Sequence, residues 1–419
     1  MPFLPPAPPT PTAPAVGGPL LLTGATGFLG MELLARYLER TERTVYALVR
    51  ARDDAQAQAR LRATVERVVD APGRFDHRLL AIRGDVAQPG LGIPRRRRLA
   101  LAAAVTEIVH AAASVSFTLP LAEAREINVE GTRRMLELAE LCMAHGRLRR
   151  FSHVSTAYVA GTATGSFGED DLDVGQGFRN TYERTKWEAE GLVRAYAERL
   201  PIQVFRPSIV VGEQTTGWTA AFNVIYAPLR AYAKGAALPL IPGRRSAPVD
   251  VVPVDYVADA IFALASREEG TGATGTYSLA AGPQASTVGE LVTLSARAFD
   301  RRRPLTLPPA LYRRTLHPLL LRRSRGARRR WLQQGPVFFP YFALRVRHDT
   351  MRTQAALAPA GIAPPPLPDY FERLVDFAEA AQWGRRTLSR VDAAGSARRR
   401  AALAASPAPL RELGALRAG

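Results

Sequence analysis

Tyr182 and Lys186 lie four residues apart in a segment that the sequence predicts as a helix, so both side chains share one helix face. A tyrosine with an ordinary pKa of about 10 is a poor proton carrier at neutral pH. A neighbouring ammonium group and the positive ring of an oxidised nicotinamide would favour the phenolate and bring the phenol into working range. The strand predicted before this helix ends in Ser155 and Thr156, and a hydroxyl there can bind the reacting oxygen. The pattern predicts acid–base chemistry beside a nicotinamide.

Lysine is rare in this chain, and its rarity adds weight to Lys186. Lysine and arginine together number 56, of which only Lys186 and Lys234 are lysines. A guanidinium cannot replace a compact ammonium group in such chemistry, so a lysine that survives a strong bias toward arginine indicates a specific role. For Lys234, chance is an equally good explanation.

A glycine-rich turn in the stretch LLLTGATGFLG, residues 20–30, supplies a candidate cofactor site. Apolar residues indicate a buried strand, after which Gly24, Gly27 and Gly30 open an amphipathic run. Without Cβ atoms the backbone can approach a pyrophosphate, and the free N–H groups and dipole of the new helix face it. The turn lacks the Gly-Lys-Ser/Thr ending of a nucleotide-hydrolase loop. It therefore predicts a dinucleotide site, with a purely structural turn as the alternative.

The elements that would position these residues alternate along the chain from Pro19. Strands are predicted at residues 45–49, 79–83, 107–110, 151–155 and 202–205, and helices at residues 28–39, 54–69, 95–105, 121–145 and 182–199. Such alternation predicts an α/β fold, a Rossmann-like doubly wound parallel sheet with helices on both faces. A site is then expected at the carboxyl ends of the strands, where the strand order reverses.

The ends of these strands offer further cofactor contacts. The second strand ends in Arg50, where an acidic residue would bind the ribose of NAD, and a cation there accommodates a 2′-phosphate instead. Arg60 could add a second guanidinium, although a solvated surface position is nearly as good an interpretation for Arg60 and Arg52. The third strand ends in Gly84-Asp85-Val86, beside the expected adenine. The fourth ends in His110, predicted as structural, and three alanines that leave room for the nicotinamide riboside.

Several longer motifs resemble one known family. The motifs TGATGFLG, HAAASVSF, NVEGT, STAYVAG, NTYERTKWEAE and FRPSIVVG together are similar to the extended short-chain dehydrogenases/reductases. FRPSIVVGEQTTGW, AFNVIYAPLRAYAKG and VDVVPVDYVADAI more specifically resemble the fatty acyl-CoA reductase (male sterility) and thioester reductase branch. The resemblance covers residues 19–299 and, less clearly, the segment to residue 384. Beyond residue 299 the terminal domain of the alcohol-forming reductases is not matched, which leaves the number of reduction steps open.

The resemblance implies an NADPH-dependent reductase of fatty acyl thioesters, either acyl-CoA or acyl carrier protein, that forms an aldehyde. If the aldehyde is retained, a second reduction would give the alcohol. Thr156, Tyr182 and Lys186 would be catalytic, with Ser155 as a competing hydroxyl and Asn128 in either a supporting or a structural role. The implied cofactor contacts are Thr23, Gly24, Thr26, Gly27, Phe28, Leu29, Gly30, Arg50, Arg60, Asp85, Val86, Ala111, Ala112, Ala113, Tyr182, Lys186, Pro207, Ser208 and Ile209. No metal site is predicted.

In the implied reaction, hydride reaches the thioester carbonyl while Tyr182 donates a proton and Thr156 hydrogen-bonds the oxyanion. Lys186 would tune Tyr182 and bind the ribose. Two other functions stay open. One is an extended short-chain enzyme acting on a sugar nucleotide or sterol, which for a sugar nucleotide would need a polar and basic pocket. The other is a non-catalytic sensor that binds the dinucleotide, for which Tyr182 and Lys186 would have no use.

The chain divides by composition into several regions. Residues 1–18 are predicted as a disordered, proline-rich leader, 19–299 as the NADP-binding domain, 300–384 as a basic, mainly helical region and 385–419 as a weakly structured tail. Within the domain, residues 212–251 are predicted as a smaller, mainly helical substrate-binding cap. Its apolar side chains either line an acyl pocket or pack the cap on the sheet, and they are Trp218, Phe222, Ile225, Tyr226, Leu229 and Leu238.

The net charge of +18 raises the question of an anionic partner. Arginines interleave with aromatic residues between residues 297 and 347, which suits an anionic membrane surface or an acidic carrier protein better than nucleic acid, given an acyl substrate. The alternative is a solvent-exposed face that carries many arginines only because the whole chain is rich in arginine. The single cysteine, Cys142, fits a reducing compartment, and neither a membrane span nor a secretory signal is found. The prediction is a cytoplasmic protein that contacts the inner membrane face at most peripherally.

Overall fold

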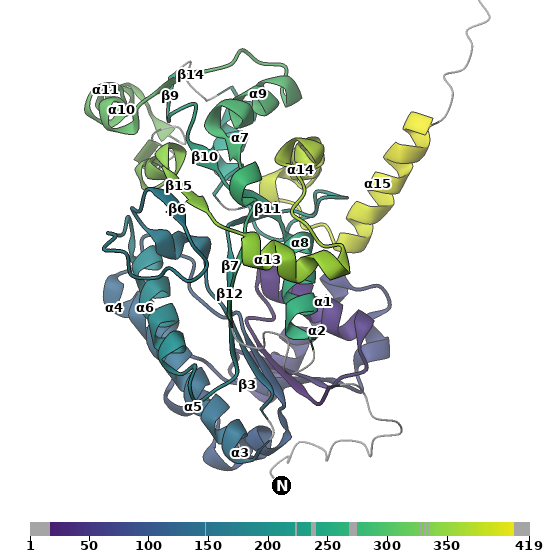
Figure 1. Ribbon diagram of the computed structural model, residues 1–419. Helices are drawn as coiled ribbons and strands as arrows, with labels where there is room; N and C mark the ends of the chain where they lie inside the picture. The colour runs from purple at the N-terminus through teal and green to yellow at the C-terminus, as the bar shows by residue number, and fades with distance from the viewer. Residues whose placement is uncertain are drawn as a thin grey trace, which may run out of the picture.

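The computed structural model describes residues 17–146, 148–222, 224–235, 240–267, 275–326, 329, 332–333 and 335–405, the last eight of these by their backbone only. Three sequence predictions fall partly outside them, because residues 1–16 of the leader, Leu238 of the cap and residues 406–419 of the tail are not among the described residues. Figure 1 shows a sheet flanked by helices in the lower part of the molecule, with the cap and C-terminal elements above it.

A seven-stranded parallel sheet forms the centre of the fold, in the order β12-β7-β5-β4-β1-β2-β3. Its strands are β1 Leu20–Thr23, β2 Val45–Val49, β3 Leu79–Arg83, β4 Glu107–His110, β5 Arg150–Val154, β7 Ile202–Pro207 and β12 Gly275–Leu279. β1 pairs with β2 on one side and β4 on the other, so the strand order reverses at β1. The predicted doubly wound parallel sheet is confirmed, and its expected site lies at the carboxyl end of β1.

Helices cover both faces of this sheet (Figure 1). They are α1 Phe28–Arg40, α2 Asp54–Val68, α3 Arg95–Ala104, α4 Leu121–Arg125, α5 Gly131–Ala144, α6 Thr181–Ala195 and α8 Val254–Ala265. Apolar residues of α1, α2 and α8 pack on one face, as Leu33, Leu61 and Ile261 illustrate. Residues of α3, α5 and α6 pack on the other. Burial of these two apolar stripes holds the strand ends in fixed positions.

The long helix predicted at residues 121–145 is confirmed, because helical backbone runs without a break through α4, a π turn at Glu126–Glu130 and α5. The π turn carries Asn128, which is buried and hydrogen-bonded to two other segments. The turn itself was not predicted, because apolar periodicity does not report a local insertion that is stabilised by tertiary hydrogen bonds.

The cap lies above the sheet and mixes one helix with short strands. Its elements and those that join it are β8 Ile209–Val211, α7 Tyr226–Ala233, β9 Leu240–Pro242, β10 Pro248–Val249, β11 Val251–Pro253, β13 Ser286–Thr287 and α9 Val288–Ala298. A separate apolar core joins them to the C-terminal region, with Leu229 from α7, Leu291 from α9 and Leu374 from α14, Phe371–Ala380. The cap and the C-terminal region therefore fold as one unit.

The C-terminal region also pairs with earlier strands. β14, Leu305–Leu307, pairs with β9 of the cap, and β15, Val346–His348, pairs with β6, Gly165–Phe167. The remaining helices are α10 Pro309–Arg314, α11 Leu316–Arg323, α13 Met351–Leu357 and α15 Arg390–Ala405. The sequence boundary predicted at residue 299 thus does not coincide with a structural break.

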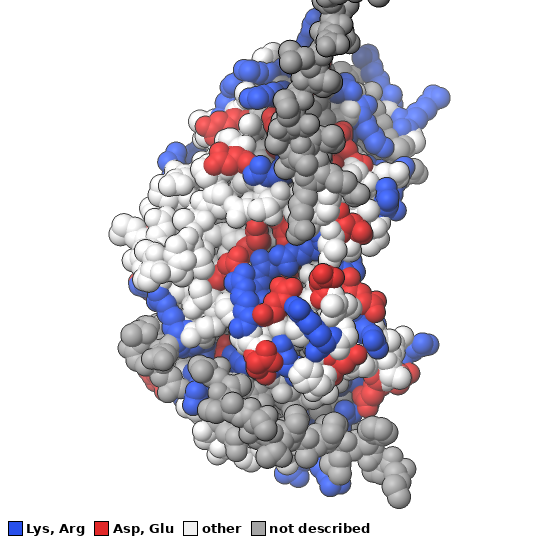
Figure 2. All heavy atoms as spheres, turned by 90° about the vertical axis from the view of Figure 1, so that its right-hand side faces the viewer, with Lys and Arg blue, Asp and Glu red and all other residues white. Residues whose placement is uncertain are grey.

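The basic residues and the aromatic residues of this region separate in the fold. Tyr312, Phe339 and Tyr341 are buried, whereas Arg313 and Arg345 are exposed. The face in Figure 2 is the side of α15 in Figure 1, away from α10 and α11, and on it basic and acidic side chains are interspersed. In the described part of the chain, no helix combines the length and apolarity that a membrane crossing requires.

Candidate active site

The glycine turn between β1 and α1 is built by close backbone approach. Gly24 has a φ of +74°, and a Cβ there would lie 2.7 Å from the carbonyl carbon of Ala111. A Cβ on Gly30 would lie 1.9 Å from the Gly24 oxygen, and the Gly27 N–H donates to that same oxygen at 2.8 Å. α1 then begins at Phe28 with no side-chain cap. The first N–H groups of α1 are thus left available for an anion, as a pyrophosphate site requires.

The ends of β1 and β4 lie in register beside this turn. Thr23 stands opposite His110, whose Nδ1 lies 2.8 Å from the Thr23 hydroxyl. The Ala112 N–H donates to the same hydroxyl at 3.2 Å, and Nε2 of His110 lies 3.2 Å from the hydroxyl of Thr132. Burial lowers the pKa of His110 to about 3, so the ring stays neutral. This geometry gives His110 a structural part in holding Ala111, Ala112 and Ala113 beside the turn.

The candidate 2′-phosphate residues lie at the carboxyl end of β2. Arg50 is exposed there, and no ion-pair partner for it exists among the residues that the structure describes. The Arg60 guanidinium donates a hydrogen bond to the Arg50 backbone oxygen. The two nearby acids are engaged elsewhere, because Asp53 accepts the Gln56 N–H at 2.7 Å and Asp54 pairs with Arg97 at 3.0 Å.

The third strand leads into the loop that was expected at the adenine. Asp85 turns its carboxylate toward its own loop, where it accepts the Ala87 N–H at 3.0 Å. Val86 is buried and lies beside Gly131 at the start of α5. The loop is therefore held to the same edge of the sheet as the glycine turn.

Tyr182, Thr156 and Lys186 meet where β5 ends beside the first turns of α6. Asn180 caps α6 by accepting the Glu183 N–H at 3.0 Å, which fixes the start of the helix. The Thr156 hydroxyl lies close enough to the Tyr182 hydroxyl to lower the pKa of that phenol. The buried Lys186 ammonium donates to the Val154 oxygen at 2.8 Å. The structure thus places Thr156 beside Tyr182, whereas the Lys186 ammonium is bound to the backbone of β5 and does not contribute to the pKa of Tyr182.

Burial dominates the protonation of this group. It raises the pKa of Tyr182 to about 12, against a smaller lowering by the Thr156 hydrogen bond. It lowers the pKa of Lys186 to about 8, against a smaller raising by the Glu190 charge. Without cofactor, Tyr182 is therefore a protonated phenol at neutral pH. A protonated phenol is the form that a reduction needs, because the developing alkoxide must receive a proton.

Ser155 points away from the Tyr182–Thr156 pair. Its hydroxyl donates to the Glu190 carboxylate at 2.6 Å. Glu190 is fully buried and pairs with Arg206 at 2.6 Å and Arg194 at 2.9 Å. These charged hydrogen bonds hold the pKa of Glu190 below its usual value, although burial alone would raise it. Ser155 thus belongs to an ion-pair network that fastens α6 to β5 and β7.

Asn128 and the segment after β7 complete the surroundings of the catalytic group. Asn128 accepts the Ser114 N–H at 2.7 Å and donates to the Thr185 hydroxyl at 2.9 Å, so it connects the loop after β4 to α6. At the end of β7, the Pro207 oxygen accepts from Thr156 at 3.4 Å. The hydroxyl of the next residue, Ser208, is buried and has no partner among the described residues. Such an orphaned hydroxyl fits a polar group of a bound nicotinamide cofactor.

Aromatic residues that the sequence did not single out surround Tyr182. The ring of Phe117 lies 5.7 Å from that of Tyr182, 5.4 Å from Tyr341 and 5.8 Å from Phe338. The Tyr341 hydroxyl donates to Glu183 at 2.6 Å and accepts from the Asn180 amide at 2.7 Å. Phe117 lies inside the motif HAAASVSF, which was the available signal, whereas nothing local marked Tyr341.

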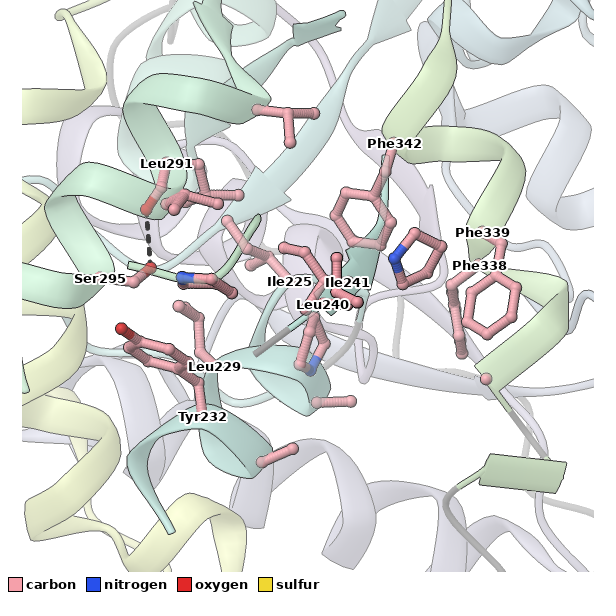
Figure 3. Close-up of a pocket in the computed structure, with 18 of the residues that line it drawn as sticks. Ile225, Leu229, Tyr232, Leu240, Ile241, Leu291, Ser295, Phe338, Phe339 and Phe342 are labelled. Atoms are coloured by element: carbon pink, nitrogen blue, oxygen red, sulfur yellow. Dashed lines mark hydrogen bonds between the residues drawn. The ribbon is translucent and has the colours of Figure 1, made fainter. Parts of the chain in front are cut away.

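An apolar cavity extends from this aromatic group under the cap (Figure 3). Its volume is about 150 Å³, and apolar side chains from α7, β9, α9 and residues 335–342 line it. Its labelled lining residues are Ile225, Leu229, Tyr232, Leu240, Ile241, Leu291, Ser295, Phe338, Phe339 and Phe342. The hydroxyl of Ser295 is already bonded to the Leu291 oxygen at 2.7 Å.

The predicted cap residues divide between lining and packing. Ile225 and Leu229 line the cavity. Trp218 packs on Phe28 with ring centroids 6.2 Å apart, and the Tyr226 hydroxyl accepts the Gly212 N–H at 3.0 Å. The other wall of the cavity comes from the C-terminal region, which the sequence did not associate with the pocket.

The fold and this group of side chains define an extended short-chain dehydrogenase/reductase. Its features are the doubly wound sheet, the glycine turn after β1 and the Tyr–Lys pair on the helix beyond β5. Residues 22–261, more than half of the chain, match the Male sterility protein family, and the chain belongs to that family. The resemblance inferred from the motifs is thereby confirmed.

The similar proteins include several reductases. Fatty acyl-CoA reductase wat of Drosophila melanogaster is 30% identical over 282 residues, and Carboxylic acid reductase of Mycobacterium marinum is 31% identical over 293 residues. These matches cover 59% and 63% of this chain, which spans 53% and 24% of those two proteins. The terminal R domain from the myxalamid PKS-NRPS biosynthetic pathway is similar in structure, with a TM-score of 0.75 and 28% identity over 88% of this chain and 92% of that domain. The chain thus belongs to a family of NAD(P)-binding reductases.

Proposed function

We propose that this protein uses NADPH to reduce acyl thioesters with apolar acyl groups to aldehydes. The observation that carries the proposal is the placement of the apolar cavity, because only the Phe117 ring separates its lining residue Phe338 from Tyr182. An acyl chain bound in the cavity would bring its carbonyl carbon to the hydroxyls of Tyr182 and Thr156. A sugar nucleotide is a poorer fit, because the cavity offers few polar groups to pair with its hydroxyls.

In this mechanism the protein binds, orients and protonates. Phe338 and Leu229 would hold the acyl chain, and the Thr156 hydroxyl would hydrogen-bond the carbonyl oxygen as negative charge develops on it. Tyr182, protonated in the free protein, would donate its proton to that oxygen. NADPH, when bound, supplies the hydride. The resulting hemithioacetal separates into an aldehyde and a thiol, and a second hydride transfer to a retained aldehyde would give the alcohol.

The cofactor would extend across the carboxyl edge of the sheet. Its pyrophosphate fits the glycine turn, and Arg50 with Arg60 would bind the 2′-phosphate that distinguishes NADPH from NADH. The Lys186 ammonium and the orphaned Ser208 hydroxyl lie where the nicotinamide riboside is expected. The exposed position of Arg50, without a carboxylate partner in the described part of the chain, supports NADPH over NADH.

An acyl group on an acidic carrier protein is a better-supported substrate than one presented at an anionic membrane. The aromatic side chains that would insert into lipid, among them Tyr312, Phe339 and Tyr341, are buried inside the fold. The arginines that remain outside suit a soluble anionic partner. Nucleic acid is not proposed as a partner, because stacking on bases would also require exposed aromatic rings.

The proposal is tested by incubating the purified protein with NADPH and a panel of acyl thioesters and identifying the products by mass. The expected result is an aldehyde or alcohol from apolar acyl groups. Tyr182→Phe should lower kcat by about 10²-fold or more, the size of a typical acid–base contribution, with NADPH affinity unchanged. Tyr196→Phe, near the other end of α6, is the matched control and should retain kcat. Turnover of no thioester, or near-normal turnover by Tyr182→Phe, would contradict the proposal.

A further inference from the structure

A second concave surface lies on the outer side of residues 336–345, the segment that forms one wall of the apolar cavity. Its lining includes the guanidinium groups of Arg179, Arg244, Arg313 and Arg345. The rest of the lining is rigid and largely uncharged, and consists of Pro308, Pro309, Ala310, Pro336, Phe339, Pro340 and Ala343. No acidic residue stands among these described lining residues. We call this surface the arginine cleft.

Three of these arginines are exposed and unengaged. Arg244, Arg313 and Arg345 have no hydrogen bond or ion pair from their side chains to any residue that the structure describes. Many other arginines of the chain do pair, as Arg97 does with Asp54 and Arg352 with Asp170. Arg179 is paired with Glu183 at 3.3 Å, whereas no carboxylate among the lining residues faces the other three arginines, so the cleft carries a positive potential that suits an anion.

The backbones that carry these arginines are fixed in place. The Arg244 N–H donates to the Phe342 oxygen at 2.9 Å, and the Arg345 oxygen accepts the Gly165 N–H at 3.0 Å. Arg313 follows the buried Tyr312 on α10. The guanidinium groups therefore extend from a preformed frame, which reduces the ordering cost of binding a ligand.

The cleft is close to the catalytic residues. Arg179 precedes Tyr182 by three residues, so their Cα atoms are less than about 12 Å apart. The Tyr341 side chain, which binds Asn180 and Glu183 at the start of α6, lies between the cleft residues Pro340 and Ala343 in the chain. The cleft does not belong to the cofactor site, because Arg50 stands at β2, on the far side of β1 from β5.

We propose that the arginine cleft binds the phosphate of the pantetheine arm through which the thioester substrate is presented. This inference rests on the proposed function and names the part of the substrate that this surface recognises. A thioester of coenzyme A and one of a carrier protein share that arm and its phosphate, linked to the reacting sulfur by two amide-linked segments. With the acyl chain in the apolar cavity and the carbonyl at Tyr182, the arm extends past Arg179 into the cleft. Guanidinium groups suit this phosphate because their paired N–H groups match its oxygens.

Two substrates that differ only in this phosphate test the proposal. Wild-type protein is assayed with one acyl group attached either to pantetheine or to 4′-phosphopantetheine. The KM for the phosphorylated thioester should be lower by about tenfold, which corresponds to 1.4 kcal/mol. Arg313→Glu and Arg345→Glu should each remove most of that advantage, leave kcat unchanged and leave the KM for the pantetheine thioester unchanged.

Neighbouring arginines provide matched controls. Arg314 follows Arg313 on α10, and Arg347 lies two residues after Arg345 on β15, yet neither lines the cleft. Arg314→Glu and Arg347→Glu alter the net charge equally and should keep the tenfold advantage. The proposal would be overturned if the wild-type KM were the same for both thioesters, or if cleft and control variants lost the tenfold advantage equally. Reduction of no thioester at all would instead refute the proposed function, which keeps the two failures distinct.

Assays with the two natural acyl donors, acyl-CoA and the acyl carrier protein, distinguish binding of the shared phosphate from binding of other anionic groups. Arg313→Glu should raise the KM for acyl-CoA and for the acyl carrier protein alike, because both carry the phosphate. A rise confined to the carrier protein would place the arginine on the surface of that protein, and a rise confined to acyl-CoA would place it on the nucleotide phosphates. Either result would overturn the assignment.

Discussion

Two neighbouring hydroxyls at the end of β5 have different expected roles, and removing each in turn separates catalysis from stability. Ser155 donates to the buried Glu190 carboxylate at 2.6 Å, whereas the Thr156 hydroxyl lies near Tyr182 and lowers the pKa of its phenol. We therefore expect Ser155→Ala to change the free energy of unfolding and Thr156→Ala to change kcat. Both substitutions remove a single hydroxyl group, Thr156→Ala together with a methyl group, and they lie one residue apart.

The structure sets the size of each effect. A hydrogen bond to a charged group contributes about 1.5–3 kcal/mol. Glu190 keeps its bonds to Arg206 and Arg194, so Ser155→Ala should cost about 1.5 kcal/mol, the lower end of that range. The bonds of Thr156 to the Pro207 oxygen and from the Tyr158 N–H are long, at 3.4 and 3.3 Å. Thr156→Ala should therefore cost less than about 1 kcal/mol of stability, while the loss of an oxyanion donor lowers kcat by about 10²–10³-fold.

Denaturant unfolding and steady-state kinetics on the same preparations measure both quantities. Thr156→Ser, which keeps the hydroxyl, should restore most of kcat. The reasoning fails if Ser155→Ala lowers kcat as much as Thr156→Ala while its unfolding free energy stays at the wild-type value. It fails equally if Thr156→Ala turns over normally.

Three further substitutions test the cofactor site, a buried carboxyl group and the cavity. In a binding titration, Arg50→Ala should weaken NADPH binding by about 1.5–3 kcal/mol and leave NADH binding unchanged. An equal loss of affinity for both cofactors would show that Arg50 has a structural role. Glu32 in α1 is buried and paired with Arg36, and burial raises its pKa to about 7, so its stabilising contribution is complete below pH 4.5 and is lost as the pH rises through 7. The stability of Glu32→Gln relative to wild type should therefore increase between pH 4.5 and 7, and parallel curves of unfolding free energy against pH would exclude the effect. Ser295 lies across the cavity from Phe338 (Figure 3), so Ser295→Leu should lower kcat/KM for long acyl chains more than for short ones, and a uniform loss would refute this placement.

The parts of the molecule that follow local rules were accessible from the sequence. Strand and helix periods predicted the order of the elements along the chain, because a buried parallel strand and an amphipathic helix leave distinct patterns. The glycine turn could be predicted from the sequence because Gly24 must adopt a positive φ and Gly30 must lie against the Gly24 oxygen. The Tyr182–Lys186 pair was readable because four residues bring two side chains to one helix face.

The parts that depend on tertiary contacts were not accessible. Whether Ser155 or Thr156 faces Tyr182 depends on the direction in which β5 delivers each hydroxyl, and only the resemblance favoured Thr156. The pKa of Tyr182 follows from its burial, which a helix pattern does not report. The π turn at Asn128 depends on partners in the loop after β4 and on α6.

The C-terminal region shows most clearly why composition alone misleads. Arginines and aromatics that alternate in sequence predict one mixed surface, but packing places them on opposite sides of a single segment. Phe338 and Phe342 line the apolar cavity, while Arg345 and Pro340 line the arginine cleft. Between them, the buried Tyr341 donates to Glu183 at 2.6 Å and so fixes this segment to the first turn of α6. Because that turn also carries Tyr182, the wall that would hold the acyl chain and the group that would protonate its carbonyl share one support, and displacement of either changes the position of the other.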